Sequence, residues 1–333
     1  MNMQAIRIHA YGGPEVMQLE ELPIPTPAPG EALIRVQAAS VNFLDLQHRR
    51  GDLVQQAFYK KKGGLNDNLP ATIGSQCVGI VEALGSDDTR VKIGDRVICG
   101  GGGGTYATHV LAPANHLIPV PEELTLEQAT AGLVQGFMAY ALTHEAYPIK
   151  PGDWCLVHAA AGGVGLFLVQ MAKIRGGRVI AVVSTEEKAQ AVREAGADEV
   201  IISTQADFAK EARRIAEGRG VNVVYDGVGK DTFEGSLDSL APRGYLELFG
   251  QASGFVPPLD LMTLQEKGSL YINRFSLLYF RDAWHDYAEH FVRWVQQGQV
   301  SVKIDRIYPL ADAAQAHKTF EQRKISGRIL LIP

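Results

Sequence analysis

The spacing of hydrophobic residues changes near the middle of the chain. Before that point, short apolar and β-branched runs are separated by glycine and proline, which is typical of strands. These runs lie at 31–40, 76–85 and 95–100, after a proline-rich extended connection at 22–30. The first third of the chain is therefore predicted to be rich in β-strands.

From Asp153 onward, apolar runs of strand length alternate with segments of helical spacing. Strands are predicted at 154–160, 178–184, 199–203, 221–229, 245–251 and, as a sixth, 269–276. Helices are predicted between them at 163–177, 185–197, 206–220 and 231–244. This regular alternation predicts a doubly wound parallel sheet with crossover helices.

The chain ends with a helix-like segment at 281–298, a further helix and an apolar strand. Because that strand follows a completed sheet, we expect it to pair within the β-rich part. The fold is thus predicted to be of the α/β class. A β-rich domain is formed by 1–125 with 277–333, and a six-stranded nucleotide-binding domain by 126–276.

The composition is that of an ordinary globular protein. The chain has 333 residues, of which 46% are hydrophobic and 21% charged, and it has no apolar run long enough to span a membrane. Its start lacks the features of a signal peptide, so we expect a cytoplasmic protein. The three cysteines do not indicate a disulfide framework. A net charge of −5 gives no reason to expect a nucleic-acid partner.

The stretch "HAAAGGVG" at 158–165 is almost a dinucleotide-binding fingerprint. Gly162 and Gly165 hold the positions where the backbone approaches the pyrophosphate and where helix and strand pack closely. Ala160 stands where the first glycine is usual, and a methyl group is tolerated there if φ stays negative. A plain tight turn is the alternative, but the stretch follows a predicted strand and opens a predicted helix. It therefore predicts a pyrophosphate site.

The choice of cofactor is indicated at the end of the second strand of this domain. A site that prefers NAD usually carries an acidic residue there, but this chain has Ser184. The next acids, Glu186 and Glu187, belong to a helix start, where acids are favoured anyway. Lys188 follows and can neutralise a 2′-phosphate, although it can equally be an exposed helix lysine. We predict NADPH rather than NADH.

The segment "GDWCLVHAAAGGVGLFLVQMAK" at 152–173 resembles the signature of the zinc-independent quinone oxidoreductases. These form the zeta-crystallin branch of the medium-chain dehydrogenase/reductase superfamily. The resemblance extends over nearly the whole chain, for example at 11–45, 223–244 and 268–274. It implies that the β-rich domain is a GroES-like catalytic domain. It also implies hydride transfer from NADPH to a quinone or a conjugated carbonyl compound, and a homodimer joined through the sixth strand.

The resemblance also assigns cofactor-binding residues. It implies that Asn42 lies near the nicotinamide ribose and that Ser184, Lys188 and Arg323 contact the 2′-phosphate. The remaining expected contacts are Ala160, Gly162, Gly163, Val164 and Gly165 in the turn, Phe249, Gly250 and Gln251 after the fifth strand, and Arg274.

Some positions depart from the family pattern. Relatives of the bacterial quinone reductase type carry tyrosines where this chain has Gln47, Leu53 and Ser203, and extra residues lie between Leu53 and Gly74. These changes weaken the expectation of a quinone and suggest a different pocket rim. A related group reduces the C=C bond of acrylates or enones, and its members also share the "VNFLD" motif at 41–45.

The zinc branch of the superfamily has metal ligands at the positions of Asn42, Ser75 and Gln135, and these residue types are poor zinc ligands. We therefore expect no metal. The amides of Asn42 and Gln135 can stabilise a developing oxyanion, or they can only hold the cofactor and line the pocket. Tyr59 is a candidate proton donor, with a surface anchor as the alternative.

The sequence therefore predicts an NADPH-dependent, zinc-independent oxidoreductase acting on quinones or α,β-unsaturated carbonyl compounds. Alternatives are an enone or acrylate reductase with little quinone activity and a zinc-free alcohol dehydrogenase. A third is an NADPH-binding crystallin-like or RNA-binding protein without enzymatic activity.

Overall fold

The computed structural model describes residues 2–52, 69–86, 90–100 and 103–333. Contacts divide the chain into two compact units, Met1–Gly132 with Lys303–Pro333, and Leu133–Val302. The first unit is thus formed by both ends of the chain. The second contains residues 277–302, which the sequence analysis had placed in the other domain.

The first unit is rich in β-strands, as the sequence predicted, and its strands pair antiparallel except for β15 and β16, which are parallel. A three-stranded sheet has the order β2-β1-β4, and a larger sheet has the order β15-β16-β3-β5-β6-β8, with β7 also paired to β3. The bounds are β1 (Asn2–Ile8), β2 (Met17–Pro23), β3 (Glu31–Ser40), β4 (Ala71–Thr72), β5 (Gln76–Leu84), β6 (Arg96–Gly100), β7 (His109–Pro113), β8 (Ile118–Pro119), β15 (Ile304–Pro309) and β16 (Arg328–Ile332). Its helices are α1 (Phe43–Arg50) and α10 (Ala313–Glu321).

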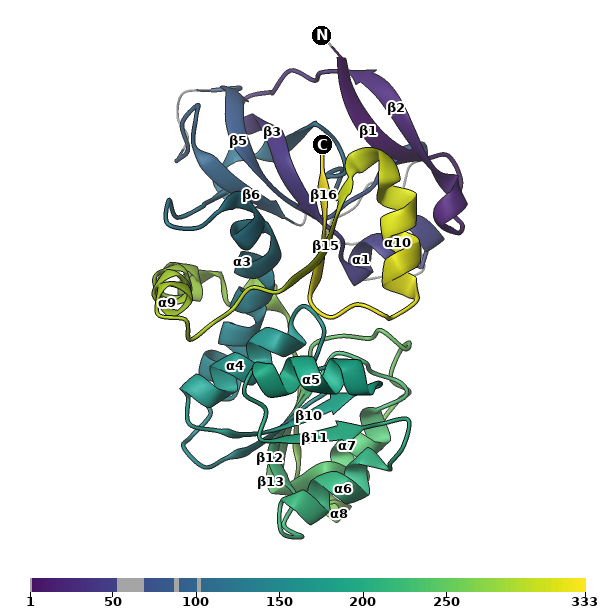
Figure 1. The fold of residues 1–333 in the computed structure, drawn as a ribbon, viewed down its shortest axis with the longest axis vertical. Coiled ribbons are helices and arrows are strands. Elements are labelled where there is room, and N and C mark those ends of the chain that lie inside the picture. The colour runs from purple at the N-terminus through teal and green to yellow at the C-terminus, as the bar shows by residue number, and fades with distance from the viewer. Residues whose placement is uncertain (1, 53–68, 87–89, 101–102) are drawn as a thin grey trace. The chain divides into compact units, whose positions relative to one another are not determined.

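The last strand of the chain, β16, lies in this unit, which confirms the prediction that the final apolar strand pairs within the β-rich part. Leu330 and Leu331 of β16 pair antiparallel with Ser40 and Ala39 of β3, and β16 lies beside β3 in Figure 1. Both leucines are fully buried, because the apolar run of β16 completes the core of this unit. This pairing brings the end of the chain close to the start of α1.

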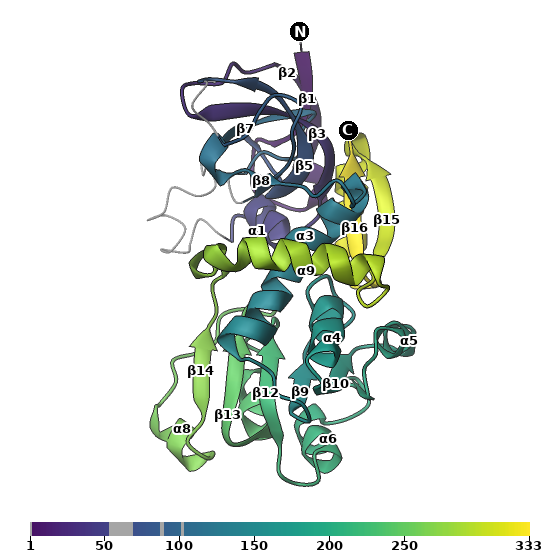
Figure 2. The ribbon, with the colours of Figure 1, turned by 90° about the vertical axis from the view of Figure 1, so that its left-hand side faces the viewer.

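The second unit contains a six-stranded parallel sheet with the order β11-β10-β9-β12-β13-β14. This is the order of a Rossmann fold, and Figure 2 shows β14, β13, β12, β9 and β10 side by side. The strands are β9 (Trp154–Val157), β10 (Arg178–Val183), β11 (Glu199–Ile202), β12 (Val221–Asp226), β13 (Leu240–Leu248) and β14 (Tyr271–Arg274). The helices are α4 (Gly165–Ile174), α5 (Glu186–Glu194), α6 (Phe208–Ile215), α7 (Phe233–Ser239) and α8 (Met262–Glu266).

The predicted helix at 231–244 was too long. Helix α7 ends at Ser239, and β13 begins at Leu240, whose register partner is Val221 on β12. Pro242 explains the difference, because proline disfavours helical backbone in the residue before it. Strand β13 therefore begins five residues earlier than the apolar pattern at 245–251 indicated.

Helix α9 (Trp284–Gln296) packs within the second unit against α3 (Leu126–Tyr140). The ring of Tyr287 stacks on Phe137, with centroids 5.4 Å apart. A Cβ atom at Gly136 would lie 2.2 Å from the hydroxyl of Tyr287, so only glycine allows this approach. The aromatic packing accounts for the membership of residues 277–302 in the second unit.

Within the described residues, the helices are all too short or too polar to cross a membrane.

The buried carboxyl of Glu247 on β13 leads to a stability prediction. It is 1% exposed and accepts a hydrogen bond from Asn273 Nδ2 at 2.7 Å. Burial raises its pKa from 4.5 to about 7. The stability linked to this group is present below pH 4.5 and is lost as the pH rises through about 7. Glu247→Gln, which is always neutral, should raise the free energy of unfolding at pH 8 by about 2 kcal/mol.

Urea unfolding of this variant at pH 8 and at pH 4.5 measures the effect. The gain should vanish at the lower pH, because the native carboxyl is then protonated in the folded state. Glu199→Gln, at an exposed position on β11, is the matched control and should show no such pH dependence. An equal gain at both pH values would rule out the ionised carboxyl as the cause.

Candidate active site

The glycine-rich turn connects β9 to helix α4, at the carboxyl edge of the parallel sheet. Ala160 is buried, and its N–H donates to Val182 O at 3.2 Å, which ties the turn to β10. The left-handed φ of +48° falls on Ala159, not on Ala160. The missing first glycine is therefore accommodated, because its position does not need the left-handed backbone.

Gly165 is the glycine that the packing requires most clearly. A Cβ atom there would lie 2.5 Å from Ala159 O and 2.6 Å from Ala160 O, so even alanine would clash with the backbone. At Gly162 the nearest atom would be Ala159 O at 3.1 Å, which is a milder contact. Gly163 and Val164 complete the turn before α4. The start of a helix without bulky side chains fits a pyrophosphate.

Ser184 follows the last residue of β10, and Lys188 lies on the first turn of α5. Lys188 Nζ donates to Ser184 Oγ at 3.4 Å, so a cation and a hydroxyl stand together at this strand end. The adjacent acid Glu186 is exposed and pairs with Arg193 at 2.7 Å. Ser203, at the end of β11, donates to Val183 O at 3.2 Å. This corner is thus suited to an anion rather than to a free ribose hydroxyl.

The ends of β12 and β13 approach each other closely at the same edge. Phe249 N–H donates to Asp226 O at 2.9 Å, and a Cβ atom at Gly250 would lie 2.4 Å from Gly227 O. Gln251 follows, and Arg274 at the end of β14 donates to Leu248 O at 2.9 Å. The structure therefore brings these predicted residues to the carboxyl edge, where open parallel sheets bind their ligands.

Asp226 is an important residue of this edge that the sequence analysis missed. It is fully buried, and its carboxylate accepts hydrogen bonds from the N–H groups of Val228 and Gly229 and from the hydroxyls of Thr232 and Ser236. These bonds shape the turn that follows β12, which packs against Phe249 and Gly250. An acid at the end of a strand, followed by glycines and then by Thr and Ser, was the available signal.

In the first unit, Asn42 lies immediately before α1 and is held by a polar cluster. Its Nδ2 donates to Ser75 Oγ at 3.2 Å and to Gln76 Oε1 at 3.3 Å, and its Oδ1 accepts from Arg328 Nη2 at 2.6 Å. Asn42 and Ser75, where the zinc branch has ligands, therefore do lie together. The cation among them is a guanidinium that belongs to the protein.

Asp45 of α1 lies beneath this cluster. Its Oδ2 accepts from the N–H of Asn42 at 2.8 Å and from Tyr106 Oη at 3.0 Å. Burial raises the pKa of Asp45 to about 6 and lowers that of Arg328 to about 10, so both groups remain charged at pH 7. The charges of Asp45 and Arg328 attract each other and offset part of the cost of burying them.

The other predicted residues fall in separate places. Gln135 is 7% exposed on α3 in the second unit, whereas Arg323 is exposed after α10 in the first, with a φ of +55°. Gln47 is half-buried on α1. Tyr59 and Leu53 lie outside the described residues. Among the residues that are described, His, Cys, Asp and Glu side chains form no group of three that can hold a metal.

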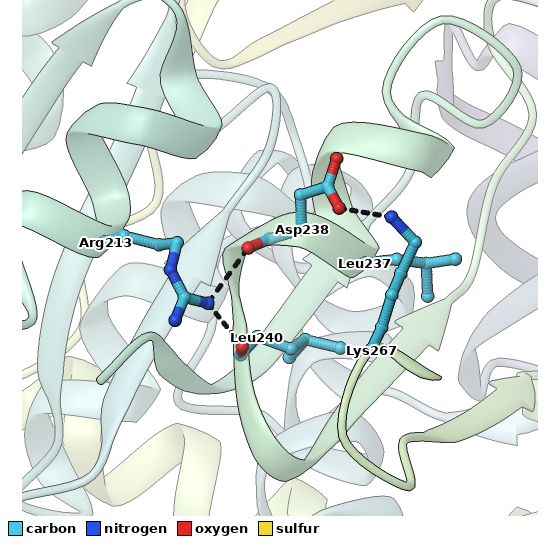
Figure 3. Close-up of a pocket in the computed structure, with 5 residues that line it drawn as sticks. All are labelled: Arg213, Leu237, Asp238, Leu240 and Lys267. Atoms are coloured by element: carbon cyan, nitrogen blue, oxygen red, sulfur yellow. Dashed lines mark hydrogen bonds and ion pairs between the residues drawn. The ribbon is translucent and has the colours of Figure 1, made fainter. Parts of the chain in front are cut away.

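A surface pocket lies elsewhere on the second unit, lined by Arg213, Leu237, Asp238, Leu240 and Lys267 (Figure 3). It is located where β13 begins, at the edge of the sheet opposite to the glycine-rich turn. Arg213 Nη1 donates to the carbonyl oxygens of Asp238 and Leu240, and Lys267 pairs with the carboxylates of Asp238 and Glu234. The cations of this pocket are thus engaged by the protein, and we do not include it in the candidate site.

Comparison with known proteins identifies the class. The alcohol dehydrogenase GroES-like domain matches residues 28–122, and the zinc-binding dehydrogenase domain matches residues 163–297. A GroES-like domain together with a Rossmann sheet defines the medium-chain dehydrogenase/reductase superfamily.

Full-length relatives define the family. The chain is 39% identical to a quinone oxidoreductase of Pseudomonas aeruginosa, over 98% of this chain and 99% of the relative. It is 38% identical to a 2-haloacrylate reductase of Burkholderia, over 100% and 99%. The solved Escherichia coli quinone oxidoreductase, complexed with NADPH, is similar with a TM-score of 0.91 at 36% identity, covering 99% and 100%. The chain therefore belongs to the quinone oxidoreductase family, a family of oxidoreductases.

Proposed function

We propose that this protein is an NADPH-dependent reductase that transfers hydride to quinones or to α,β-unsaturated carbonyl compounds. The observation that carries the proposal is the end of β10, where Ser184 and Lys188 stand in place of a carboxylate. An anionic 2′-phosphate is attracted there, whereas a carboxylate would repel it. The solved relative in complex with NADPH supports the same cofactor.

The residues of the second unit fit this cofactor. Helix α4 begins behind a turn of small residues and offers its N–H groups to a pyrophosphate. Ser184 and Lys188 would hold the 2′-phosphate, and Phe249 to Gln251 with Arg274 would line the cofactor at the neighbouring strand ends. The bound nicotinamide supplies the hydride. The protein binds and orients the nucleotide, and amide donors such as Gln135 stabilise negative charge on the acceptor.

A C=C reductase for acrylates or enones is the second candidate. It is favoured by the similarity to the 2-haloacrylate reductase and by Gln47 on α1, where quinone reductases carry a tyrosine. Oxidation of NADPH should be followed with a panel of quinones, enones and 2-haloacrylates. Turnover of haloacrylates alone would favour the second candidate. Steady alcohol oxidation by metal-free protein would favour an alcohol dehydrogenase, and NADPH binding without turnover a non-enzymatic role.

The resemblance also motivates a homodimer formed through the sixth strand. Strand β14 is one of the two outer strands of the sheet, and Tyr271 on it is 45% exposed, which supports pairing with a second copy. Light scattering after gel filtration tests this state. Catalysis without zinc is tested by metal analysis of the active protein. The cytoplasmic location stays a prediction.

Removal of Lys188 tests the cofactor assignment. Lys188→Ala should weaken NADPH binding about 10-fold and leave NADH binding nearly unchanged, because only the 2′-phosphate carries the charge that the ammonium neutralises. Arg323→Ala should act in the same direction. Titration of cofactor fluorescence measures the affinities. Lys210→Ala, an exposed lysine on α6 paired with Asp207, is the matched control. Equal losses for both cofactors would mean that these residues do not read the phosphate.

A further inference from the structure

Arg328 on β16 is a buried cation that donates hydrogen bonds to Ser40 and Asn42 of the first unit. Its residue exposure is 7%, and its Nη2 donates to Asn42 Oδ1 at 2.6 Å and to Ser40 Oγ. Its Nε has no hydrogen-bond partner within the part of the chain that the structure describes. Burying a guanidinium with an unused donor costs free energy, so the stability of this unit alone gives little reason to place it here.

The contacts of Arg328 fix which way the amide of Asn42 points. An arginine can only donate, so the atom of Asn42 that faces it must be the carbonyl oxygen. The NH2 group then faces Ser75 and Gln76. Gln76 confirms this orientation independently, because its own Nε2 donates to Thr130 O at 2.9 Å and leaves Oε1 as the acceptor toward Asn42.

A second chain of hydrogen bonds leads to the same cluster from the other side. Arg49 Nη1 lies 3.1 Å from His317 Nδ1, so that nitrogen accepts and the proton of the ring is on Nε2. Burial, with the charge of Arg49, lowers the pKa of His317 to about 3, which keeps the ring neutral. His317 Nε2 therefore donates to Tyr106 Oη at 3.1 Å, and Tyr106 donates to Asp45.

The two chains meet at Asp45. Its carboxylate is an acceptor for Tyr106, for the N–H of Asn42 and for the hydroxyl of Ser75. Because Ser75 donates to Asp45, its oxygen accepts from the NH2 group of Asn42. Every donor and acceptor in the cluster is thus compatible with one orientation of the Asn42 amide.

We propose that Arg328 is a positioning residue for the proposed reaction. Its guanidinium fixes the amide of Asn42 so that the carbonyl oxygen of the amide faces Arg328. This inference rests on the proposed function and on the family resemblance, which implies that Asn42 lies near the nicotinamide ribose. Without the guanidinium, the amide can rotate and exchange its donor and acceptor. The nucleotide and the electron acceptor would then be held in a less reactive arrangement.

A double-mutant cycle in the protein without ligand tests the contact itself. Asn42→Ala, Arg328→Met and the double variant are unfolded in urea. The loss in midpoint for the double variant should be smaller than the two single losses together, because both remove the same interaction. Additive losses would overturn the proposed coupling. This result does not depend on any turnover, so it separates failure of this inference from failure of the proposed function.

Kinetics then distinguish positioning from a merely structural role. In folded Arg328→Met, we expect kcat to fall about 10- to 100-fold while the dissociation constant of NADPH changes less than about threefold. Arg328→Lys should restore part of kcat. In the Asn42→Ala background, Arg328→Met should have little further effect on kcat. An unchanged kcat in folded Arg328→Met would overturn the proposal.

Two further variants keep the test decisive. Arg328→Met leaves the carboxylate of Asp45 buried without its cation, so Asp45→Asn is combined with it if the single variant does not fold. The pair is then compared with Asp45→Asn alone. Arg96→Met is the matched control, because Arg96 donates to Leu124 O within the same unit. It should lower stability without lowering kcat, and a similar fall of kcat in this control would overturn the specific role of Arg328.

Discussion

Replacing Ser184 with aspartate is expected to reverse the proposed preference for NADPH over NADH. The new carboxylate would stand at the end of β10, pair with Lys188 and repel a 2′-phosphate. Repulsion between this carboxylate and the 2′-phosphate, together with pairing of the Lys188 ammonium to the new carboxylate, should weaken NADPH binding about 100-fold, or about 2.7 kcal/mol. NADH should bind more tightly, because a carboxylate in this position accepts hydrogen bonds from the ribose hydroxyls.

The dissociation constants of NADPH and NADH are measured at one ionic strength, and their ratio gives the cofactor preference. Gln190→Glu adds the same charge at an exposed position of helix α5 and serves as the control. It should leave the ratio unchanged, since its charge is screened by solvent. If Ser184→Asp still prefers NADPH, the end of β10 does not select the cofactor, and the proposal for NADPH loses its main support.

Much of the fold followed from the spacing of hydrophobic residues. The strand and helix alternation after Asp153 predicted the six-stranded sheet, and the apolar run at the end of the chain predicted its return to the β-rich part. The extent of α7 and the packing of α9 were not predicted. A local pattern does not show where a proline ends a helix in favour of strand pairing. It also does not show which unit receives an aromatic helix such as α9.

The candidate site was predicted unevenly, for a similar reason. The glycine-rich turn and Ser184 are local features, so their residue types and spacing were sufficient to predict that they follow the first two strands of the parallel sheet. Their roles in binding stay predictions. The cluster around Asn42 is assembled from α1, the start of β5, the segment before β7, α10 and β16. Antiparallel pairing of β3 with β5 and β16 brings these segments together, and the spacing of residues in a single sequence does not reveal that register. Arg328 and His317 therefore carried no signal.

Asp226 is expected to be among the most important residues for the stability of the second unit. Asp226→Ala would remove the carboxylate acceptor of the Val228 and Gly229 N–H groups at the end of β12, and that of two hydroxyls that keep second partners. Each unsatisfied buried donor costs about 1–3 kcal/mol, but the turn can relax, so we expect a total loss of about 4 kcal/mol. Urea unfolding followed by circular dichroism measures it.

Two comparisons distinguish the loss of the Asp226 hydrogen bonds from the general effect of removing a carboxylate. Asp207→Ala removes the acceptor of Ala209 and Lys210 N–H at the solvent-exposed start of α6, so it should cost much less than Asp226→Ala. Asp226→Asn keeps one acceptor oxygen, so its loss in the free energy of unfolding should lie between those of Asp226→Ala and Asp207→Ala. If Asp226→Ala costs no more than Asp207→Ala, water or a rearranged turn satisfies the donors. If the larger loss is found, the turn after β12, against which Phe249 and Gly250 pack, is held by this carboxylate. Folded Asp226→Asn should then also bind NADPH more weakly.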